Sequence, residues 1–181
     1  MLRNLARLFR RNASAFKGAQ QGATAVEFAL IAPAFIALLI AIFETTQFLY
    51  VQANLQVAAT QAARLFMTGQ AQSSGMSQAQ IEATICPTVK ALVNCANLVI
   101  NVQSSSSATG LSTSTPQMYN AQGQLNSGNY SLGTPGDLMV VQIGYPLPVV
   151  AGPLGFLLSG NGNGTASVWG VAAFRVEPYA S

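Results

Sequence analysis

The feature that most constrains this chain is an uninterrupted apolar segment close to its N-terminus. Residues 28–43, which read FALIAPAFIALLIAIF, contain no charged or hydrogen-bonding side chain. Extending the segment back to Ala23 adds only Thr24 and Glu27 as polar residues. A helix needs about 17–25 apolar residues to cross the hydrocarbon core of a bilayer. Residues 23–43 therefore predict a transmembrane helix and make membrane lipid the first expected partner.

The apolar segment is expected to remain in the mature protein. A secretory signal peptide has an apolar region of about 7–15 residues followed by a cleavage site with small residues. This run is longer, and the polar residues Glu-Thr-Thr-Gln follow it at 44–47. Glu44 is predicted to mark the non-cytoplasmic interface of the membrane. Pro33 lies inside the segment and predicts a kink or a loosened helical turn, or is simply a proline that a membrane helix tolerates.

Basic residues are concentrated before the apolar segment. The stretch before Gly18 contains no acidic residue and holds Arg3, Arg7, Arg10, Arg11 and Lys17. Nucleic-acid binding is one interpretation of such a cluster. Its position directly before an apolar segment favours the positive-inside rule instead. The chain is therefore expected to have its N-terminus in the cytoplasm, its C-terminus across the membrane, and no nucleic-acid partner.

The composition excludes most catalytic chemistry. The chain has no histidine, only two cysteines, and 7% charged residues, against about 25% in a typical soluble domain. Histidine-based acid–base catalysis and zinc sites with four Cys/His ligands are therefore excluded. The nucleophile elbow G-x-S-x-G is also missing from the sequence. The sequence predicts a protein that is not an enzyme, with no catalytic residue, no metal site, no cofactor and no evident small-molecule substrate.

The predicted helix continues beyond the membrane. Apolar or small residues recur at alternating spacings of three and four, at Phe48, Val51, Leu55, Ala58, Ala62 and Leu65. This stripe is typical of an amphipathic helix, which is expected to run to about Met67 and to stop at Gly69. Packing of the stripe against a domain of the same chain is favoured over an exposed coiled-coil seam.

A short second helix and a disulfide are expected next. Residues 77–80 form the capping box Ser-x-x-Gln, and Pro87 is expected to break or restart the helix. Cys86 and Cys95 are nine residues apart. A disulfide between them needs a turn in the chain, because one straight helix would hold their Cα atoms about 13.5 Å apart. The predicted non-cytoplasmic location favours the bond, and two buried free thiols are the alternative.

The C-terminal part predicts β-structure. Candidate strands are residues 98–102, 138–145 and 166–176, and loops are expected at 104–116 and 110–136. The apolar stretch 146–158 is expected to form a loop that contacts the bilayer or a partner pilin, or else packs under the strands. The glycine-rich residues 160–164 are expected to form a flexible tip.

The predicted fold class is α+β. A long N-terminal transmembrane helix extends outside the membrane, a short second helix follows, and a small antiparallel sheet of about three strands packs on the long helix. The expected divisions are a basic leader at 1–22, the membrane helix at 23–43, its amphipathic extension at 44–69, and a small non-cytoplasmic head at 70–181.

The start of the apolar segment resembles a type IV prepilin processing site. The residues are Gly22-Ala-Thr-Ala-Val-Glu27-Phe28, preceded by the basic leader. In that family a membrane-embedded aspartyl peptidase cuts after the glycine, and the fifth mature residue is glutamate. The resemblance implies cleavage between Gly22 and Ala23 and assigns Glu27 and Phe28 to subunit assembly. In a filament, the Glu27 carboxylate can pair with the Ala23 amine of a neighbouring subunit, which offsets two charges that are individually unfavourable in an apolar core.

Residues 22–66 are similar to the TadE-like family of minor pilins or pseudopilins from tight-adherence (Tad/Flp) systems. The residues that carry the likeness are Ala25–Leu30, Pro33, Glu44, Tyr50 and Ala62–Arg64. Thr46 and Gln47 depart from the small residue and arginine usual in the family, so no role is transferred to them. The family implies processing by a prepilin peptidase, residence in the bacterial inner membrane with a periplasmic head, and a place in an extracellular pilus. Its implied partners are other pilins and Tad assembly proteins.

Two other classes of protein remain open from the sequence. The main alternative is an uncleaved single-pass membrane anchor that presents a periplasmic binding module. A membrane-bound enzyme is the third class, and no catalytic constellation in the sequence supports it.

Overall fold

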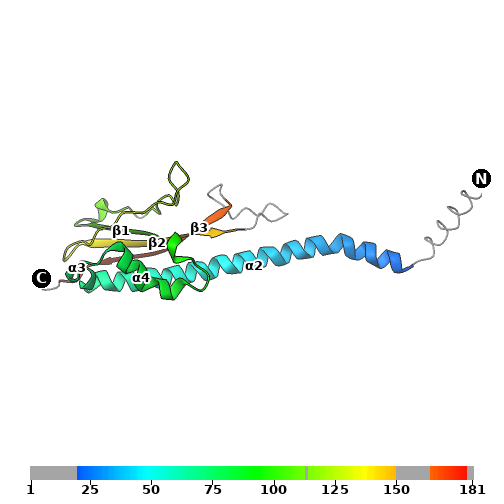
Figure 1. Cartoon of the computed structure of the whole chain (residues 1–181), viewed down its shortest axis with the longest axis horizontal. Coiled ribbons are helices and arrows are strands. Elements are labelled where there is room, and N and C mark those ends of the chain that lie inside the picture. Colours follow the sequence, from blue (N-terminus) through cyan, green and yellow to red (C-terminus); the bar gives the residue numbers. More distant parts are fainter. Residues whose placement is uncertain (1–19, 113, 150–163, 179–181) are drawn as a thin grey trace, which may run out of the picture. The chain divides into compact units, whose positions relative to one another are not determined.

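The computed structural model describes residues 20–112, 114–149 and 164–178, and Figure 1 shows their helices and strands. The chain divides into two units, Met1–Ile42 and Phe43–Ser181. Helix α2 (Gln20–Met67) begins in the first unit and ends in the second. Residues 1–19 of the predicted leader, and 150–163 of the predicted apolar loop and tip, lie outside the described residues.

The described part of the first unit is the N-terminal part of α2. Most of its large apolar side chains are exposed, and Phe28 and Leu30 are 72% and 75% exposed. Pro33 lies inside α2, and the helix continues on both sides of it. One missing backbone hydrogen bond therefore does not end this helix. The expectation of a long, apolar N-terminal helix is confirmed.

In the second unit, the C-terminal part of α2 supplies one layer of a hydrophobic core. The buried residues on one face of the helix are Val51, Leu55, Ala58, Ala59, Ala62 and Phe66. Phe48 and Leu65 are partly buried against the same core. The predicted stripe therefore packs within the chain rather than forming an exposed seam.

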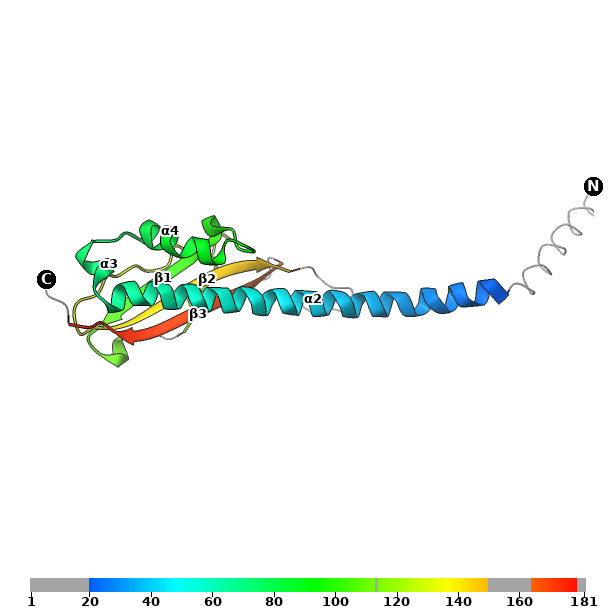
Figure 2. The same cartoon turned by 90° about the horizontal axis from the view of Figure 1, so that it is seen from below.

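Three antiparallel strands form the second layer, in the order β1-β2-β3. They are β1 (Val99–Ser105), β2 (Leu138–Pro148) and β3 (Thr165–Arg175). Figure 2 shows α2 running along one side of this sheet within the second unit. A Cβ atom at Gly170 of β3 would collide with the backbone carbonyl of Leu55. Glycine at this position therefore lets strand and helix backbones approach closely.

The strands are longer than the sequence predicted at two places. Ser104 and Ser105 belong to β1, because they pair with Met139 and Leu138. Residues 146–148, expected to open an apolar loop, extend β2 by pairing with residues 165–167 of β3. Among the described residues, β1 pairs only with residues 138–144 of β2, so at Pro146 the strand has a neighbour on one side only, where the missing N–H of proline is tolerated.

Two short helices follow α2. Gly69, with φ 74°, ends α2 as predicted and precedes α3 (Gln70–Ser73). Helix α4 (Gln78–Val89) starts at the expected capping box, in which the side chains of Ser77 and Gln80 each bond to the other's backbone N–H. The expectation that Pro87 breaks the helix is wrong, because α4 continues through it to Val89. The proline removes one hydrogen bond only, and the burial of Ile85 and Val89 in the core keeps the last turn helical.

Part of the segment between β1 and β2 lies over the sheet face that carries Asn101 and Gln142, and its residues Asn129 and Ser131 pair with the backbone of Val102. The segment contains the 3-10 turn η2 (Ala108–Gly110) and is held by a buried polar network. The Asn101 amide donates to the Gln142 side-chain oxygen at 2.7 Å, and both residues are almost fully buried. Asn101 also accepts from the Asn129 backbone N–H, and Gln142 donates to the Ser114 carbonyl. The expected surface loop is therefore anchored through buried amides whose polar groups are paired.

Candidate processing and assembly site

Gly22 lies near the start of α2 and is exposed. A Cβ atom added there would meet nothing within 4 Å. Its φ does not lie in the left-handed region where seven other described glycines are found. Neither packing nor backbone conformation therefore requires glycine at this position, in contrast to Gly170. Another protein, such as a peptidase that requires a small residue, could therefore recognise Gly22.

Glu27 is exposed on α2, one helical turn after Ala23. The residues three and four positions away along the helix are Ala23, Thr24, Leu30 and Ile31. None of these side chains is basic, so no ion pair within one helical turn neutralises the carboxylate. An ionised carboxylate at the centre of a membrane helix costs about 2.5–3.5 kcal/mol. Glu27 therefore needs a shallow depth in the membrane or a cation from outside this turn of the helix.

Phe28 follows Glu27 and begins the most apolar part of α2. In the part of the chain that the structure describes, Thr24–Met67 is the one helix that is long and apolar enough to cross a membrane. Only 6% of its most apolar 18-residue window is buried. A soluble core helix would bury such a window. The first unit therefore has the properties of a membrane anchor.

Glu44 lies near the unit boundary and differs from Glu27 in its surroundings. It is 8% exposed, whereas Glu27 is fully on the surface of the helix. The chain therefore shields the Glu44 side chain from solvent, whereas the Glu27 side chain is left exposed. The assignment of Glu44 to the non-cytoplasmic interface stays a prediction.

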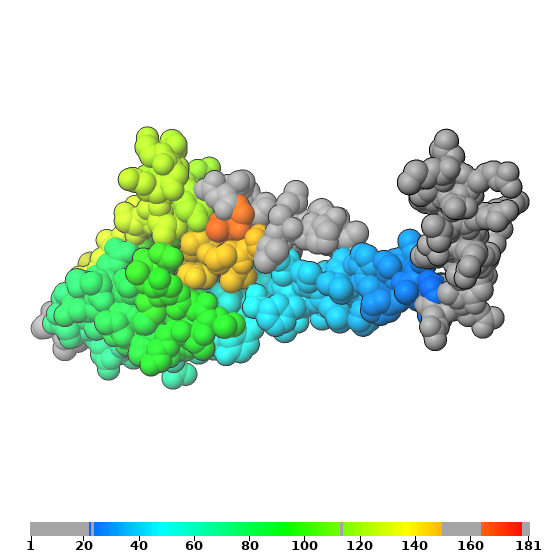
Figure 3. All heavy atoms as spheres, turned by 45° about the vertical axis from the view of Figure 1, so that its right-hand side comes forward, coloured from blue at the N-terminus to red at the C-terminus, as the bar shows by residue number. Residues whose placement is uncertain are grey.

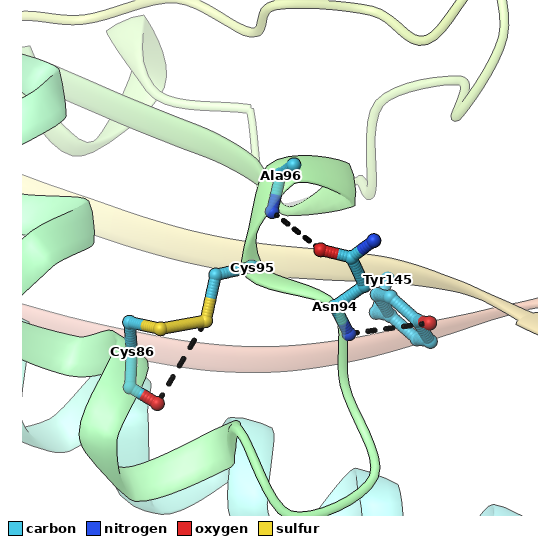
Figure 4. The surroundings of a disulfide bond; sticks show 5 residues. All are labelled: Cys86, Asn94, Cys95, Ala96 and Tyr145. Atoms are coloured by element: carbon cyan, nitrogen blue, oxygen red, sulfur yellow. Dashed lines mark hydrogen bonds between the residues drawn. A yellow bond between two sulfur atoms is a disulfide. The ribbon is translucent and has the colours of Figure 1, made fainter.

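Cys86 and Cys95 form a disulfide with a Cα–Cα distance of 5.8 Å, which the sequence favoured over free thiols. Figure 4 shows the turn that makes it: Asn94 accepts from the Ala96 N–H at 3.2 Å, and its own N–H donates to the Tyr145 hydroxyl at 3.5 Å. The bond joins the last turn of α4 to the turn η1 (Cys95–Asn97). It fixes the chain at its entry into β1 and is remote in sequence from the proposed cleavage position.

Sequence reasoning missed the role of Gln56. Its side-chain amide donates to the Val171 carbonyl at 2.8 Å and accepts from the Val171 N–H at 3.1 Å. One amide thus pairs with the outer backbone edge of β3, as a neighbouring strand would. Polar residues on the face of a helix opposite its apolar stripe are usually solvated, so the sequence carries no signal of this contact.

The described residues offer no metal centre. In residues 20–112, 114–149 and 164–178, no group of three or more His, Cys, Asp or Glu side chains could hold a metal ion. Chemically, the site presents the peptide bond that follows Gly22 and places the Glu27 carboxylate about one helical turn further along an apolar helix.

The protein thus belongs to the class that combines an α+β head with an N-terminal apolar helix that has the properties of a membrane anchor. Residues 22–64 match the family model described as TadE-like protein, which confirms the resemblance of this segment to that family. The match begins at Gly22 and stays within α2. Comparison of the chain with curated proteins and with solved structures finds no match. The family match indicates a protein related to the Tad pilus.

Proposed function

We propose that this chain is a TadE-like minor pilin or pseudopilin that is processed by a prepilin peptidase and takes part in Tad/Flp pilus assembly. The basic leader stays in the cytoplasm, residues 23–43 span the bacterial inner membrane, and the head lies in the periplasm. The observation that carries the proposal is the coincidence of two features at one residue. The family match starts at Gly22, and Gly22 is a glycine that the fold does not require.

Cleavage after Gly22 changes the charge of the anchor. It removes the leader with its five basic residues and creates an α-amine on Ala23. The reference pKa of an α-amine is about 7.7–8.0, so the new terminus carries a positive charge at neutral pH. The anchor then begins with a cation and carries an anion, Glu27, one helical turn later.

These two charges support a mode of assembly. When anchors of several subunits pack together, the Ala23 amine of one subunit pairs with the Glu27 carboxylate of the next. Two charges that are each unfavourable in an apolar environment are then neutralised together. The pairing also sets the axial register between adjacent helices, while exposed side chains such as Phe28 supply packing area. Other pilins and Tad assembly proteins are the partners, and an extracellular pilus is the final location.

The cleavage step is tested by intact mass measurement of the protein extracted from membranes of its native cells. The wild-type chain is expected to begin at Ala23. Gly22→Leu is expected to retain the leader and begin at Met1 or its processed form. Gly18→Leu is the matched control, since it makes the same change four residues earlier, and it should still yield a chain that begins at Ala23.

The assembly step is tested separately with Glu27→Gln. This variant is expected to keep the mature mass, because the cleaved bond is unaltered, and to lose cross-links to partner pilins in cells. Glu82→Gln, an acid-to-amide change in the head, is the control and should keep the cross-links. Unchanged cross-linking of Glu27→Gln would refute the pairing of amine and carboxylate while leaving cleavage intact.

The alternative function is an uncleaved single-pass anchor that presents a periplasmic binding module. Its support is that Phe43–Ser181 forms a compact unit of its own, as a presented module would. A wild-type chain that retains its leader in native membranes would favour this alternative over the pilin.

A further inference from the structure

We propose that the head carries a binding site for a neutral saccharide, in a cavity between residues 115–123 and strand β3. The cavity has a volume of about 620 Å³, within the range of about 300–1,000 Å³ that small-molecule sites occupy. Its lining includes Gln117, Tyr119, Asn120, Ala121, Ser167 and Trp169. The proposal does not depend on leader cleavage or filament assembly, since all these residues lie in Phe43–Ser181.

One wall of the cavity is a hairpin-like segment with many internal hydrogen bonds. Tyr119 and Leu125 form a β-bridge. The Asn120 side-chain oxygen accepts from the backbone N–H groups of Gln122 and Gln124 at 3.0 and 2.8 Å. Met118 anchors the segment by its burial. Figure 3 shows this yellow-green segment standing out from the surface beside the orange start of β3. The wall is therefore formed before any ligand arrives, which lowers the entropic cost of binding.

The other wall is β3, with Trp169 as its largest side chain. Trp169 is paired in register with Gly144 of β2. A Cβ atom at Gly144 would lie 2.6 Å from the indole ring, so the ring lies over the glycine in space that any other residue would fill. Tyr119 reaches toward the same strand, and its hydroxyl lies 3.4 Å from the Thr165 hydroxyl. Two aromatic side chains with restricted positions thus line one cavity.

The chemistry of the lining identifies the class of ligand. The cavity is lined by amide and hydroxyl side chains, by Tyr119 and Trp169, and by small or apolar residues, and none of its lining residues is charged. The lining therefore offers no counter-charge to a charged ligand. A purely apolar ligand would cover the exposed Gln117 without replacing the bonds of its amide to water. A neutral saccharide has hydroxyls for the Gln117 amide, which both donates and accepts, and C–H faces for the electron-rich aromatic rings.

Trp169 also provides the measurement, because it is the only tryptophan in the chain. The full chain is purified in a detergent without a sugar headgroup and titrated with a panel of neutral oligosaccharides: malto-, cello-, chito-, manno- and galacto-oligosaccharides. At least one series is expected to change the Trp169 emission saturably. Sialylated or uronate oligosaccharides are expected to bind at least about tenfold more weakly. No saturable change with any neutral member, or a preference for acidic sugars or for short peptides, would overturn the proposal.

A pair of adjacent variants locates the binding. Ala121→Arg places a long side chain in the cavity and is expected to weaken binding by at least about tenfold. Gln122→Arg adds the same charge at the next position, which is exposed and does not line the cavity, and is expected to change affinity by less than about twofold. Both changes lie on an exposed turn, and equal unfolding midpoints verify that both variants are folded. Equal affinities in the two variants would place the ligand elsewhere and refute the site.

Discussion

The two parts of helix α2 have the same secondary structure and opposite surroundings. In Met1–Ile42 the helix carries exposed apolar side chains such as Phe28 and Leu30. In Phe43–Ser181 its apolar residues form one stripe, and members such as Leu55 and Phe66 are completely buried. The first part is apolar without a stripe, and the second is amphipathic. The pattern of apolar residues, rather than their number, tells which part is covered by its own chain.

The comparison also indicates what each part requires from outside. A soluble monomer leaves exposed apolar patches of a few hundred Å², and an entire apolar helix exceeds this. The N-terminal part of α2 therefore requires lipid or neighbouring helices around it. The C-terminal part requires neither, because the sheet and α4 cover its stripe. Substitutions that are equivalent in chemistry should have different effects in the two parts.

The largest difference is expected between two phenylalanines of α2. Phe66 is fully buried and packs edge-on against Tyr130, with ring centroids 6.2 Å apart. Phe66→Ala should lower the free energy of unfolding of the head by about 3–5 kcal/mol. Phe28→Ala removes a side chain that is 72% exposed and should change it by less than about 0.5 kcal/mol. Denaturant unfolding of the full chain in detergent, followed by Trp169 emission, measures both.

A similar loss of stability in both variants would contradict the comparison. It would mean that the head depends on the apolar part of α2 for its fold. If neither variant lost stability, the core around Phe66 would be able to close over the space that the Phe66→Ala substitution leaves. Either result would require a new account of which residues stabilise Phe43–Ser181.

The disulfide is expected to have the next largest effect, and only in the head. The double variant Cys86→Ser/Cys95→Ser should lower the free energy of unfolding by about 2–3 kcal/mol, because the unfolded chain gains the freedom of the opened loop. Dithiothreitol should lower the stability of the wild-type chain by a similar amount and leave that of the double variant unchanged. Equal sensitivity of the two proteins to dithiothreitol would show that the bond is absent in solution.

A smaller effect is expected at the contact between α2 and the edge of β3. Gln56→Ala removes two hydrogen bonds to Val171 and should lower the free energy of unfolding by about 1–2 kcal/mol. Gln52→Ala is the matched control, since Gln52 lies one turn earlier on α2 and is exposed, and should be neutral. If the two variants are equally stable, the Gln56 amide contributes nothing to holding strand and helix together.

The elements that could be predicted from the sequence are those with local causes. The apolar segment 23–43 and the alternating spacings of the stripe together predicted the length of α2. The capping box of Ser77 and Gln80 predicted the start of α4. Gly69 marked a helix end because its left-handed conformation suits a residue without a side chain. The TadE-like resemblance was carried by residues such as Ala25–Leu30, Glu44 and Ala62–Arg64, and the family model matches residues 22–64.

The features that could not be predicted depend on residues far apart in the chain. Residues 146–148 form strand because β3 pairs with them, and Pro87 remains helical because buried neighbours fix its turn. The cavity beside Trp169 is formed by residues 115–123 and β3, which are about 45 residues apart. No local pattern in either segment indicates that they meet. Propensity and periodicity describe single elements and cannot predict such pairings.

The smallest expected effect concerns Tyr130 and depends on pH. Its hydroxyl donates to the Met76 carbonyl at 2.6 Å, and burial raises the pKa of Tyr130 above its usual value of 10.0. Tyr130→Phe removes this hydrogen bond and should lower the free energy of unfolding at neutral pH by about 0.5–1.5 kcal/mol. Phe66 keeps its aromatic neighbour in this variant, so the change isolates the hydroxyl.

The sign of the pH effect follows from the direction of the pKa shift. Above pH 10 the unfolded chain loses the Tyr130 proton before the folded chain does, so the folded state loses relative stability as the pH rises toward the raised value. The stabilisation of the neutral hydroxyl is fully present below pH 10. Unfolding measured from pH 8 to pH 11 should therefore show a shallower alkaline decline for Tyr130→Phe than for the wild-type chain. Tyr119→Phe, which removes a hydroxyl from the exposed hairpin-like segment, is the control. Identical declines in the two variants would show that the Tyr130 hydroxyl is not buried in the folded head, and would weaken the contrast between a covered and an uncovered part of α2.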